Sequence, residues 1–196
     1  MAPELERQLA AYHPCCEQEA VDRDVMLHFL RENTDAFTRE NLVAHFTASS
    51  WIVNSSRTHA LMAWHNLYRA WSWTGGHADG ETDLLSVALR EAREETGLTL
   101  TDYRYRGIVT FVSDRWETEY MHLFTATGWT GRIREDCDEG VLEWIHKDRL
   151  AALPQWAGDR IFLDLLRQGA PFFSLKLRYQ GETLVYACLN GKELTL

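Results

Sequence analysis

The stretch that decides the fold is Gly75–Leu98, which reads GGHADGETDLLSVALREAREETGL. Apolar residues recur in its second half with the spacing i, i+3, i+4 and i+7, and this period predicts an amphipathic helix. The residues of this stripe, which we expect to dock on a core, are Leu85, Ala88, Leu89 and Ala92. Thr82 or Asp83 can cap the start of the helix, and Gly97 can end it in a left-handed conformation. The paired glycines at the beginning of the stretch allow the backbone to approach a ligand closely.

Three glutamates lie beside that apolar stripe. Glu91, Glu94 and Glu95 are spaced i, i+3 and i+4, and at roughly 100° per residue they share one face of the helix. Carboxylates this close repel each other, by up to about 4 kcal/mol per pair at an effective dielectric constant of about 20. A hard divalent cation makes such a cluster favourable, because Mg²⁺ binds carboxylates together with substrate phosphates. Taken alone, the glutamates are more typical of a solvated acidic face, on which Arg90 can pair with Glu94.

The whole pattern resembles the signature of the Nudix hydrolases, G-x5-E-x7-R-E-U-x-E-E-x-G-U, in which U is a bulky aliphatic residue. The residues that fall in register are Gly76, Arg90, Glu91, Glu94, Glu95, Gly97 and Leu98. Ala92 is a small residue at the first U position. One position departs from the signature, because Thr82 stands where the family has its first glutamate and Glu81 comes one residue earlier. This departure leaves open a shifted loop or a lowered activity.

Length and composition predict one globular domain. The chain has 196 residues, of which 45% are hydrophobic and 25% are charged. A net charge of −9 argues against a nucleic-acid polymer as ligand, because phosphate backbones are bound by clustered Lys and Arg. No apolar run approaches the roughly 20 residues that span a bilayer, and the N-terminus lacks the pattern of an export signal. The four cysteines, Cys15, Cys16, Cys137 and Cys188, have no zinc-site spacing, and we therefore expect a cytoplasmic protein with free thiols.

The chain divides into two expected parts, an N-terminal helical extension over residues 1–40 and a Nudix hydrolase domain over residues 41–196. Glu4–Tyr12 and Glu17–Arg31 have helical composition. Three pairs of strand-like segments predict hairpins: Phe46–Val53 with Ala60–Trp64, Tyr103–Val112 with Thr118–Thr125, and Phe172–Tyr179 with Thr183–Leu189. Val141–Ile145 is a further strand, and Arg160–Gln168 has the spacing of a helix. Strands around one long central helix fit the α/β class and the α/β/α sandwich with a mixed sheet that the resemblance implies.

A second acidic group precedes the strand that contains Trp144. The sequence Asp136-Cys137-Asp138-Glu139-Gly140 has good turn composition, and a plain polar turn is one interpretation of it. In Nudix enzymes a glutamate ahead of an aromatic-containing strand often completes the metal site, and Glu139 fits that position. Glu143 or Glu119 could take the same role.

From Gly107 onward the chain resembles the 8-oxo-dGTP diphosphatase (MutT-type) branch of the family. The matching stretches are GIVTFVSDRWETEYMHLF, DEGVLEW, LPQWAGDRIFLDLL and FFSLKLRYQGETL. In that branch an aromatic and an acidic residue hold the oxidised purine, and the corresponding residues here are Trp156 and Asp159. An indole stacks on a base, and a carboxyl group can read its N–H donors. Equally, Asp159 can be the N-cap of the following helix and Trp156 can belong to the core.

The front half of the chain resembles a different Nudix branch, one with an N-terminal helical extension. The stretches that carry this resemblance are HFTASSWIVN, ALMAWHNLY and WSWTGGHADGE. Some oxidised-purine enzymes have an Asn shortly before the paired glycines that contacts the base. Ser72 stands at that place here and offers less, so the two halves indicate one superfamily but not one substrate.

The resemblance implies a metal-dependent mechanism. Glu91, Glu94, Glu95 and Glu139, with the carbonyl of Gly75, would hold one or more Mg²⁺ or Mn²⁺ ions. The metals would polarise a diphosphate linkage and lower the pKa of a bound water. Glu94 or Glu95 would accept the proton of the attacking water, and Arg90 would orient the glutamates. A nucleoside triphosphate would give the monophosphate and pyrophosphate.

Several function classes remain open at the level of the sequence. The first is a nucleotide pyrophosphohydrolase, with oxidised purine triphosphates of the 8-oxo-dGTP type as the best single substrate. Other NDP-X substrates, such as ADP-ribose or a dinucleotide, are the alternative within that class. Isopentenyl diphosphate isomerase shares a Nudix-type box but needs a catalytic cysteine and glutamate. No cysteine here has a convincing context for that role, and Cys137 alone keeps this class open. A non-catalytic nucleotide sensor is the third class. We expect a small nucleotide as partner, with residues 1–40 available for a homodimer contact.

Overall fold

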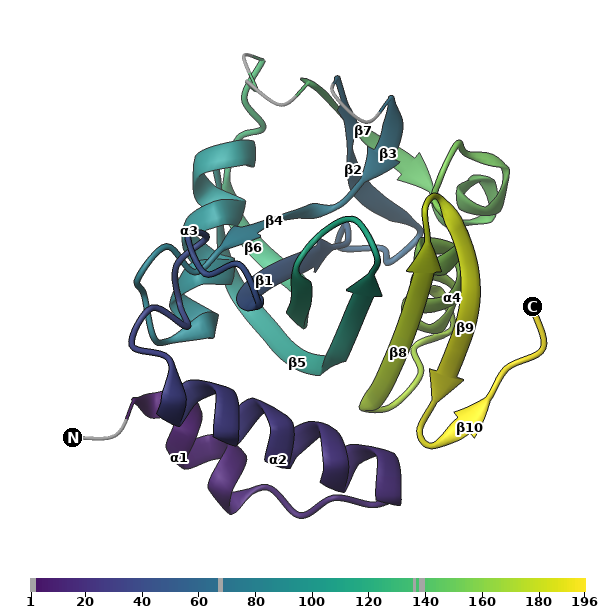
Figure 1. Cartoon of the computed structure of the whole chain (residues 1–196). Coiled ribbons are helices and arrows are strands. Elements are labelled where there is room, and N and C mark those ends of the chain that lie inside the picture. Colours follow the sequence, from purple (N-terminus) through teal and green to yellow (C-terminus); the bar gives the residue numbers. More distant parts are fainter. Residues whose placement is uncertain (1–2, 67–68, 136, 138–139) are drawn as a thin grey trace.

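The structure is a computed structural model that describes residues 3–66, 69–135, 137 and 140–196 of the chain. Figure 1 shows a central sheet with helices packed around it and a smaller group of strands beside it. The helices are α1 (Glu4–Ala11), α2 (Glu17–Glu32), α3 (Leu84–Thr96) and α4 (Ala157–Gln168), with a 3-10 helix η1 (Lys147–Ala152). The strands are β1 (Ala44–Ile52), β2 (His59–His65), β3 (Ala70–Ser72), β4 (Thr74–His77), β5 (Leu98–Ser113), β6 (Thr118–Gly131), β7 (Gly140–His146), β8 (Phe173–Gln180), β9 (Thr183–Leu189) and β10 (Lys192–Glu193).

The main sheet is mixed and has seven strands in the order β10-β9-β8-β5-β6-β1-β4. Two of its neighbouring pairs are parallel, β1 with β6 and β5 with β8, and the other pairs are antiparallel. A second sheet of three strands, in the order β3-β2-β7, stands beside it. The predicted strand pairs β5–β6 and β8–β9 are therefore confirmed.

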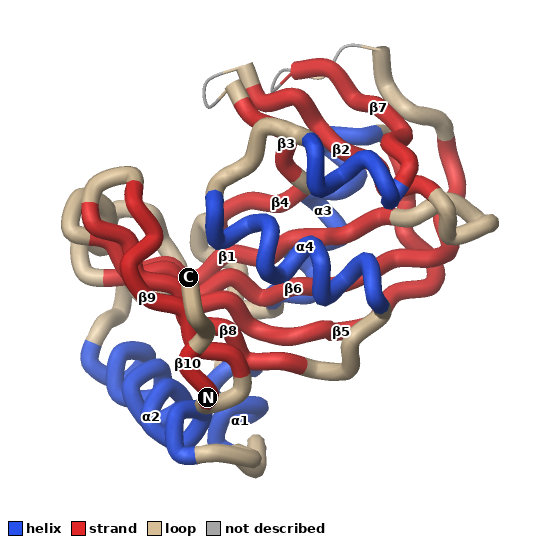
Figure 2. The backbone as a smooth tube through the Cα atoms, turned by 90° about the vertical axis from the view of Figure 1, so that its right-hand side faces the viewer, coloured by secondary structure: helices blue, strands red, loops and turns tan. Residues whose placement is uncertain are grey.

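The helices cover the main sheet on both faces. Strand β1 alternates between them: Phe46 and Ala48 belong to the core under α3, whereas Trp51 belongs to the core under α4, as does Val53 directly after the strand. Figure 2 shows α4 lying across the near face of the sheet, with α3 behind it. This arrangement confirms the predicted α/β/α sandwich.

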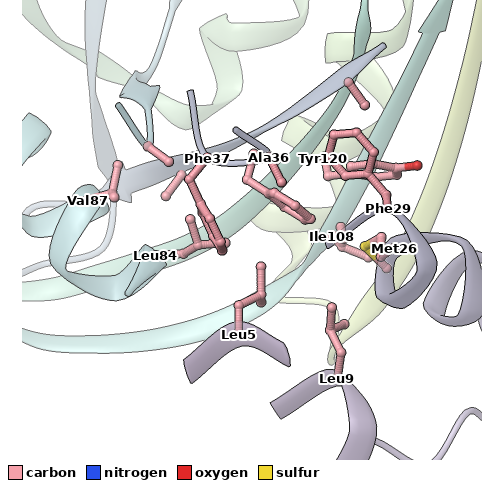
Figure 3. Packing of buried hydrophobic residues seen from close by; sticks show 14 of the residues in the cluster. Leu5, Leu9, Met26, Phe29, Ala36, Phe37, Leu84, Val87, Ile108 and Tyr120 are labelled. Atoms are coloured by element: carbon pink, nitrogen blue, oxygen red, sulfur yellow. The ribbon is translucent and has the colours of Figure 1, made fainter. Parts of the chain in front are cut away.

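The N-terminal extension is helical, as predicted, and it packs on the sheet. Leu5 and Leu9 of α1 point toward Met26 of α2 and toward Leu84 and Ile108, which belong to α3 and β5 (Figure 3). All five side chains are buried in one cluster. The helices α1 and α2 thus pack on the same face of the main sheet as α3, which we call the α3 face, and cover the part of it that the short helix α3 does not.

The predicted hairpin of Phe46–Val53 with Ala60–Trp64 is wrong. The strands form nearly as expected, but β1 pairs with β6 and β4, while β2 pairs with β3 and β7 in the second sheet. A single isolated bridge, Val53 to Ala60, joins the two segments. Because β1 is buried on both faces, it is better satisfied between two long-range neighbours than at the edge of a local hairpin.

In the part of the chain that the structure describes, no helix is long and apolar enough to cross a bilayer.

Candidate active site

Helix α3 begins and ends at residues that satisfy its free backbone groups. The side chain of Asp83 is the N-cap and accepts from the N–H of Leu85 at 3.1 Å, while Gly97 ends the helix with φ 77°. Glu81 has a related role, because its carboxylate accepts the N–H groups of Thr82 (2.7 Å) and Asp83 (2.9 Å). The acid that comes one residue before the signature position therefore stabilises the turn that leads into the helix.

The buried face of α3 is rotated relative to the predicted stripe. Ala88 and Ala92 are buried as expected, but Leu84 and Val87 complete the face, and Leu85 and Leu89 are only partly buried. The rotation follows from where the helix rests, because the Ala88 carbonyl accepts a hydrogen bond from Ser50 of β1 at 3.3 Å. A period of 3.6 residues identifies an amphipathic helix, but it leaves the orientation of the stripe to the surface that receives it.

Glu91 is half-buried and is held by its neighbour in the chain. The Arg90 guanidinium donates to Glu91 Oε1 at 3.2 and 2.7 Å, and it also donates to the carbonyl of His77 in β4 at 3.2 Å. The hydrogen bond to Glu91 is the main cause of the raised pKa of Arg90. The predicted pairing of Arg90 with Glu94 is wrong, because the His77 carbonyl draws the guanidinium toward β4. Arg90 thus links the glutamate face of α3 to the strand that carries the glycines.

The paired glycines bring the backbone of β4 against two of the glutamates. The N–H of Gly75 donates to Glu95 Oε1 at 3.1 Å. A Cβ atom on Gly76 would lie 2.5 Å from Glu91 Oε2, and one on Gly75 would lie 2.7 Å from Cα of Ser49. At Gly75 only glycine leaves room beside the backbone of Ser49, whereas a side chain at Gly76 would displace the carboxylate of Glu91. The structure therefore brings together Gly75, Glu91 and Glu95, three of the predicted metal-site residues.

Glu94 is placed differently from the other two glutamates. It is exposed, and with Arg90 and Arg93 it lines a surface pocket of about 450 Å³ beside α3. Its backbone carbonyl accepts from Arg134 at 2.5 Å. Its side chain therefore faces solvent, where a substrate can reach it.

The oxygen-rich donor set of α3 suits a hard divalent cation, since Mg²⁺ and Mn²⁺ prefer carboxylate and carbonyl oxygens. Among the described residues, Cys15, Cys16 and Glu19 form a cluster of potential metal ligands whose ligand atoms lie within 4.8 Å of one another. The glutamates of α3 do not form such a cluster. Two of those glutamates instead accept from Arg90 and from the Gly75 N–H. Each of these donors offsets part of the repulsion between the carboxylates.

The residues considered for the remaining metal ligand lie apart from α3 or outside the described residues. Glu139, with Asp136 and Asp138, lies outside them. Glu143 is exposed on β7 of the second sheet. Glu119 lies on the face of β6 that α4 covers, opposite the face on which α3 packs. Glu139 as a metal ligand stays a prediction.

Asp159 is buried at the start of α4, with 9% of its surface exposed. The N-cap of α4 is Trp156, so the interpretation of Asp159 as N-cap is wrong; Asp159 is the third residue of the helix and accepts from the N–H of Trp156. This is the reciprocal half of a capping box. Burial raises the pKa of Asp159 to about 7; the Trp156 N–H opposes the rise, and the charge of Glu119 adds to it. Near pH 7 this carboxyl group can therefore donate or accept a hydrogen bond.

Trp156 is partly buried beside Asp159. Its ring meets Tyr179 edge to face, with the centroids 5.8 Å apart, and meets Trp116 in the same way at 6.4 Å. Tyr179 in turn accepts the N–H of Gly158 at 2.8 Å, which fixes the start of α4 against β8. Trp156 is thus both a core contact and a partly accessible aromatic ring, as the two interpretations of its role require.

Ser72 is the third predicted substrate residue. It lies on β3, where its hydroxyl donates to the carbonyl of Ala63 at 3.4 Å. The neighbouring N–H of Trp71 donates to the carbonyl of Pro154 at 3.1 Å, so β3 adjoins the loop before α4. In the ranges that the structure describes, no hydrogen bond joins Ser72 to Trp156 or Asp159.

A cluster of polar residues near Asp159 was not predicted from the sequence. Thr47 of β1 donates to Glu119 Oε1 at 2.7 Å, and the rings of His45 and His77 lie 4.7 Å apart. Burial raises the pKa of Glu119, an effect that the Thr47 hydroxyl opposes. The signal was present in β1, AHFTASSWI, whose polar residues at 45, 47 and 49 fall on one face of a buried strand. Together with Asp159, these groups make the face of the main sheet that α4 covers polar near the starts of β1 and β6.

A family profile described as the NUDIX domain matches residues 44–166, which is more than half of the chain. The chain belongs to the Nudix family. Its relatives include the uncharacterised Nudix hydrolase YvcI of Bacillus subtilis, 30% identical over 103 residues that cover 50% of this chain and 65% of that protein. The oxidized purine nucleoside triphosphate hydrolase of Danio rerio is 29% identical over 117 residues, which cover 59% of this chain and 73% of that one.

A solved structure supports the same fold. The MutT protein from Bacillus halodurans aligns with a TM-score of 0.67 and 23% sequence identity, over 74% of this chain and 96% of that one. The Nudix domain and its hydrolase relatives together support a hydrolase that acts on phosphorus-containing anhydrides. The signature residues and the Nudix fold are thus found in one chain.

The two glycines of the Nudix box predict different effects of the same substitution. In Gly76→Ala the new Cβ meets the end of the flexible Glu91 side chain, so we expect nearly unchanged stability but an about 10- to 100-fold loss of metal-dependent turnover. In Gly75→Ala the Cβ meets the backbone of Ser49, and we expect an overpacking cost of about 1–3 kcal/mol. Thermal unfolding and phosphate release measure the two effects. An unaffected turnover in a folded Gly76→Ala protein would contradict the placement of Glu91.

Asp159 predicts a pH dependence of stability. Because its pKa rises from 3.8 to about 7 on folding, its effect on stability is most favourable below pH 3.8 and is lost as the pH rises toward 7. Asp159→Asn removes this loss. The free energy of unfolding of the variant, relative to that of the wild type, should therefore increase by about 2–3 kcal/mol from pH 5 to pH 8. Denaturant unfolding at several pH values measures it. Asp164→Asn, an exposed change on the same helix, is the matched control, and a parallel pH profile for Asp159→Asn and the wild type would refute the prediction.

Proposed function

We propose that this chain is a metal-dependent Nudix pyrophosphohydrolase that cleaves a nucleoside diphosphate linkage. The observation that carries the proposal is the contact of Gly75 and Gly76 with the carboxylates of Glu95 and Glu91. It places a flat stretch of backbone, without side chains, beside a cluster of negative oxygens. A diphosphate can approach such a surface only with cations, and that is the chemistry of the family.

The proposed metal ligands are Glu91, Glu94, Glu95 and Glu139 with the carbonyl of Gly75, and the proposed ion is Mg²⁺ or Mn²⁺. When bound, the metal supplies positive charge for the phosphate oxygens and lowers the pKa of a coordinated water. Glu94 or Glu95 accepts the proton of the attacking water. The exposure of Glu94 supports its access to substrate, and the Gly75 N–H holds one oxygen of Glu95 in place. Arg90 is a positioning residue, because it contacts Glu91 and β4.

The proposed substrate is an oxidised purine nucleoside triphosphate of the 8-oxo-dGTP type, converted to the monophosphate and pyrophosphate. Trp156 would stack on the base, and Asp159 would read its edge. A carboxyl group with a pKa of about 7 suits such a base, which presents both N–H donors and carbonyl acceptors. The name of the Danio rerio relative supports this class of substrate, and Glu119 with Thr47 adds polar groups nearby. Ser72, already bonded to Ala63, would give the base less than an Asn does.

The glutamates test the reaction. Glu94→Gln and Glu95→Gln keep the shape of the side chain but remove its charge and basicity, so each should lower kcat by at least about 100-fold with Mg²⁺ or Mn²⁺ present. Glu182→Gln, an exposed change in the β8–β9 turn, is the control and should keep full turnover. Circular dichroism establishes that each variant is folded. Undiminished turnover in both box variants would defeat the proposed chemistry.

A substrate panel tests the leaving group. We expect 8-oxo-dGTP to be preferred over dGTP, ADP-ribose, dinucleoside polyphosphates and NADH. Trp156→Ala should raise KM for 8-oxo-dGTP by about 5- to 150-fold, the value of one lost base stack, and change kcat less. A preference for ADP-ribose or a dinucleotide would keep the Nudix chemistry and refute the base site. Nucleotide binding without any metal-dependent phosphate release would instead indicate a sensor.

A further inference from the structure

A cavity of about 370 Å³ lies between the N-terminal helices and the sheet. Side chains of α1 and α2, among them Leu9 and Met26, form one wall. The opposite wall is the sheet, with Ile108 of β5 and His122 of β6, and Leu84 at the start of α3 closes one side. Figure 3 shows the apolar residues that surround this region. The cavity is on the α3 face, opposite the face that carries Trp156 and Asp159.

Two buried polar side chains line this cavity with one atom each still unpaired. Asp22 is 5% exposed; its Oδ1 accepts from Lys176 at 2.6 Å, and its Oδ2 is buried without a hydrogen-bond partner. His122 is 6% exposed; its Nδ1 is 3.1 Å from the Tyr105 hydroxyl, and its Nε2 is also buried without a partner. Buried polar atoms are nearly always hydrogen-bonded, so two such atoms at one cavity indicate a ligand that satisfies both.

The other walls define the kind of ligand. Tyr12, Tyr105, Phe124 and Phe172 contribute aromatic rings, which favour a flat molecule. The charged lining residues are Glu19, Asp22, Asp83 and Arg23, an acidic excess that disfavours a phosphate group.

Asp22 Oδ2 and His122 Nε2 require different hydrogen-bond partners. A carboxylate oxygen accepts only, so Asp22 Oδ2 needs an N–H or O–H donor. Burial keeps His122 neutral and lowers its pKa to about 3, so its Nε2 pairs as a neutral imidazole nitrogen. When the Tyr105 hydroxyl accepts from Nδ1, Nε2 is an acceptor; when it donates, Nε2 carries the proton.

We propose that this cavity is a second, non-catalytic binding site for a flat amino-substituted heterocycle of nucleobase or nucleoside size, bound through an N–H donor to Asp22 and a hydrogen bond to His122. Its volume falls at the lower end of the range typical of small-molecule pockets. The ligand would join α2 to β6 and so fasten the N-terminal helices to the sheet. The site does not depend on the hydrolase reaction, since none of the proposed metal or base residues lines it.

The test uses adenosine as the probe, with purine riboside, whose base has no N–H group, and AMP, which adds a phosphate. Isothermal titration with the full chain should show adenosine binding at least tenfold tighter than purine riboside or AMP. Asp22→Asn, which replaces the accepting oxygen by an amide, should weaken adenosine binding at least tenfold. Glu32→Gln, an exposed change at the end of the same helix, is the matched control and should bind as the wild type does.

A second variant covers the case in which Asp22→Asn fails to fold because it breaks the ion pair with Lys176. Leu9→Phe adds a ring to the cavity wall and should abolish binding while leaving turnover unchanged. Trp156→Ala should bind adenosine as the wild type does, which separates this site from the active site. No adenosine binding at millimolar concentration, or equal binding by Leu9→Phe and the wild type, would overturn the proposal.

Discussion

The contact between strand β4 and the glutamates of α3 is the constraint on which the rest of the structure depends. Gly75 donates to Glu95 through its N–H, and Gly76 leaves room for Glu91 because it has no Cβ on the side of the helix. Carboxylates that repel each other are thus held in place by backbone and by the adjacent Arg90. The main sheet supports this contact, since β4 is the edge strand at one end of the described strand order and pairs with β1.

The two faces of the main sheet pack against different helices. One face receives α3 and its glutamates, together with α1 and α2, which fill the remaining area with apolar side chains. The other receives α4, whose first turn places Trp156 and Asp159 near Glu119. In the proposed complex a nucleotide spans the edge at β4, with its phosphates at the glutamates and its base on the α4 side. Strand β1, whose side chains alternate between the two faces, contributes to both parts of the proposed site.

Much of the architecture was predictable because it depends on local pattern. A box helix with an N-cap at Thr82 or Asp83 and an end at Gly97 was expected, and the structure has the N-cap at Asp83 and the end at Gly97. The β5–β6 and β8–β9 pairs were equally local, each joined by a short turn. The pairing of β1 was not, since parallel pairing with β6 joins segments more than 70 residues apart, a separation that no local signal reports. The polar cluster of Thr47 and Glu119 is a product of that same long-range pairing.

The sequence by itself determined the family, the helix of the box and the helical character of the first residues, because spacing and composition are sufficient for these. The tertiary structure alone decided which carboxylate contacts which donor: Arg90 binds Glu91 rather than Glu94 because the His77 carbonyl lies within its reach. It also decided that Asp159 is buried, and so keeps its proton to about pH 7. The cavity beside Asp22 and His122 could not be foreseen either, since it exists only where α2 meets a strand 100 residues further along the chain. Spacing along a helix is a local property, whereas burial and the identity of a partner depend on the whole fold.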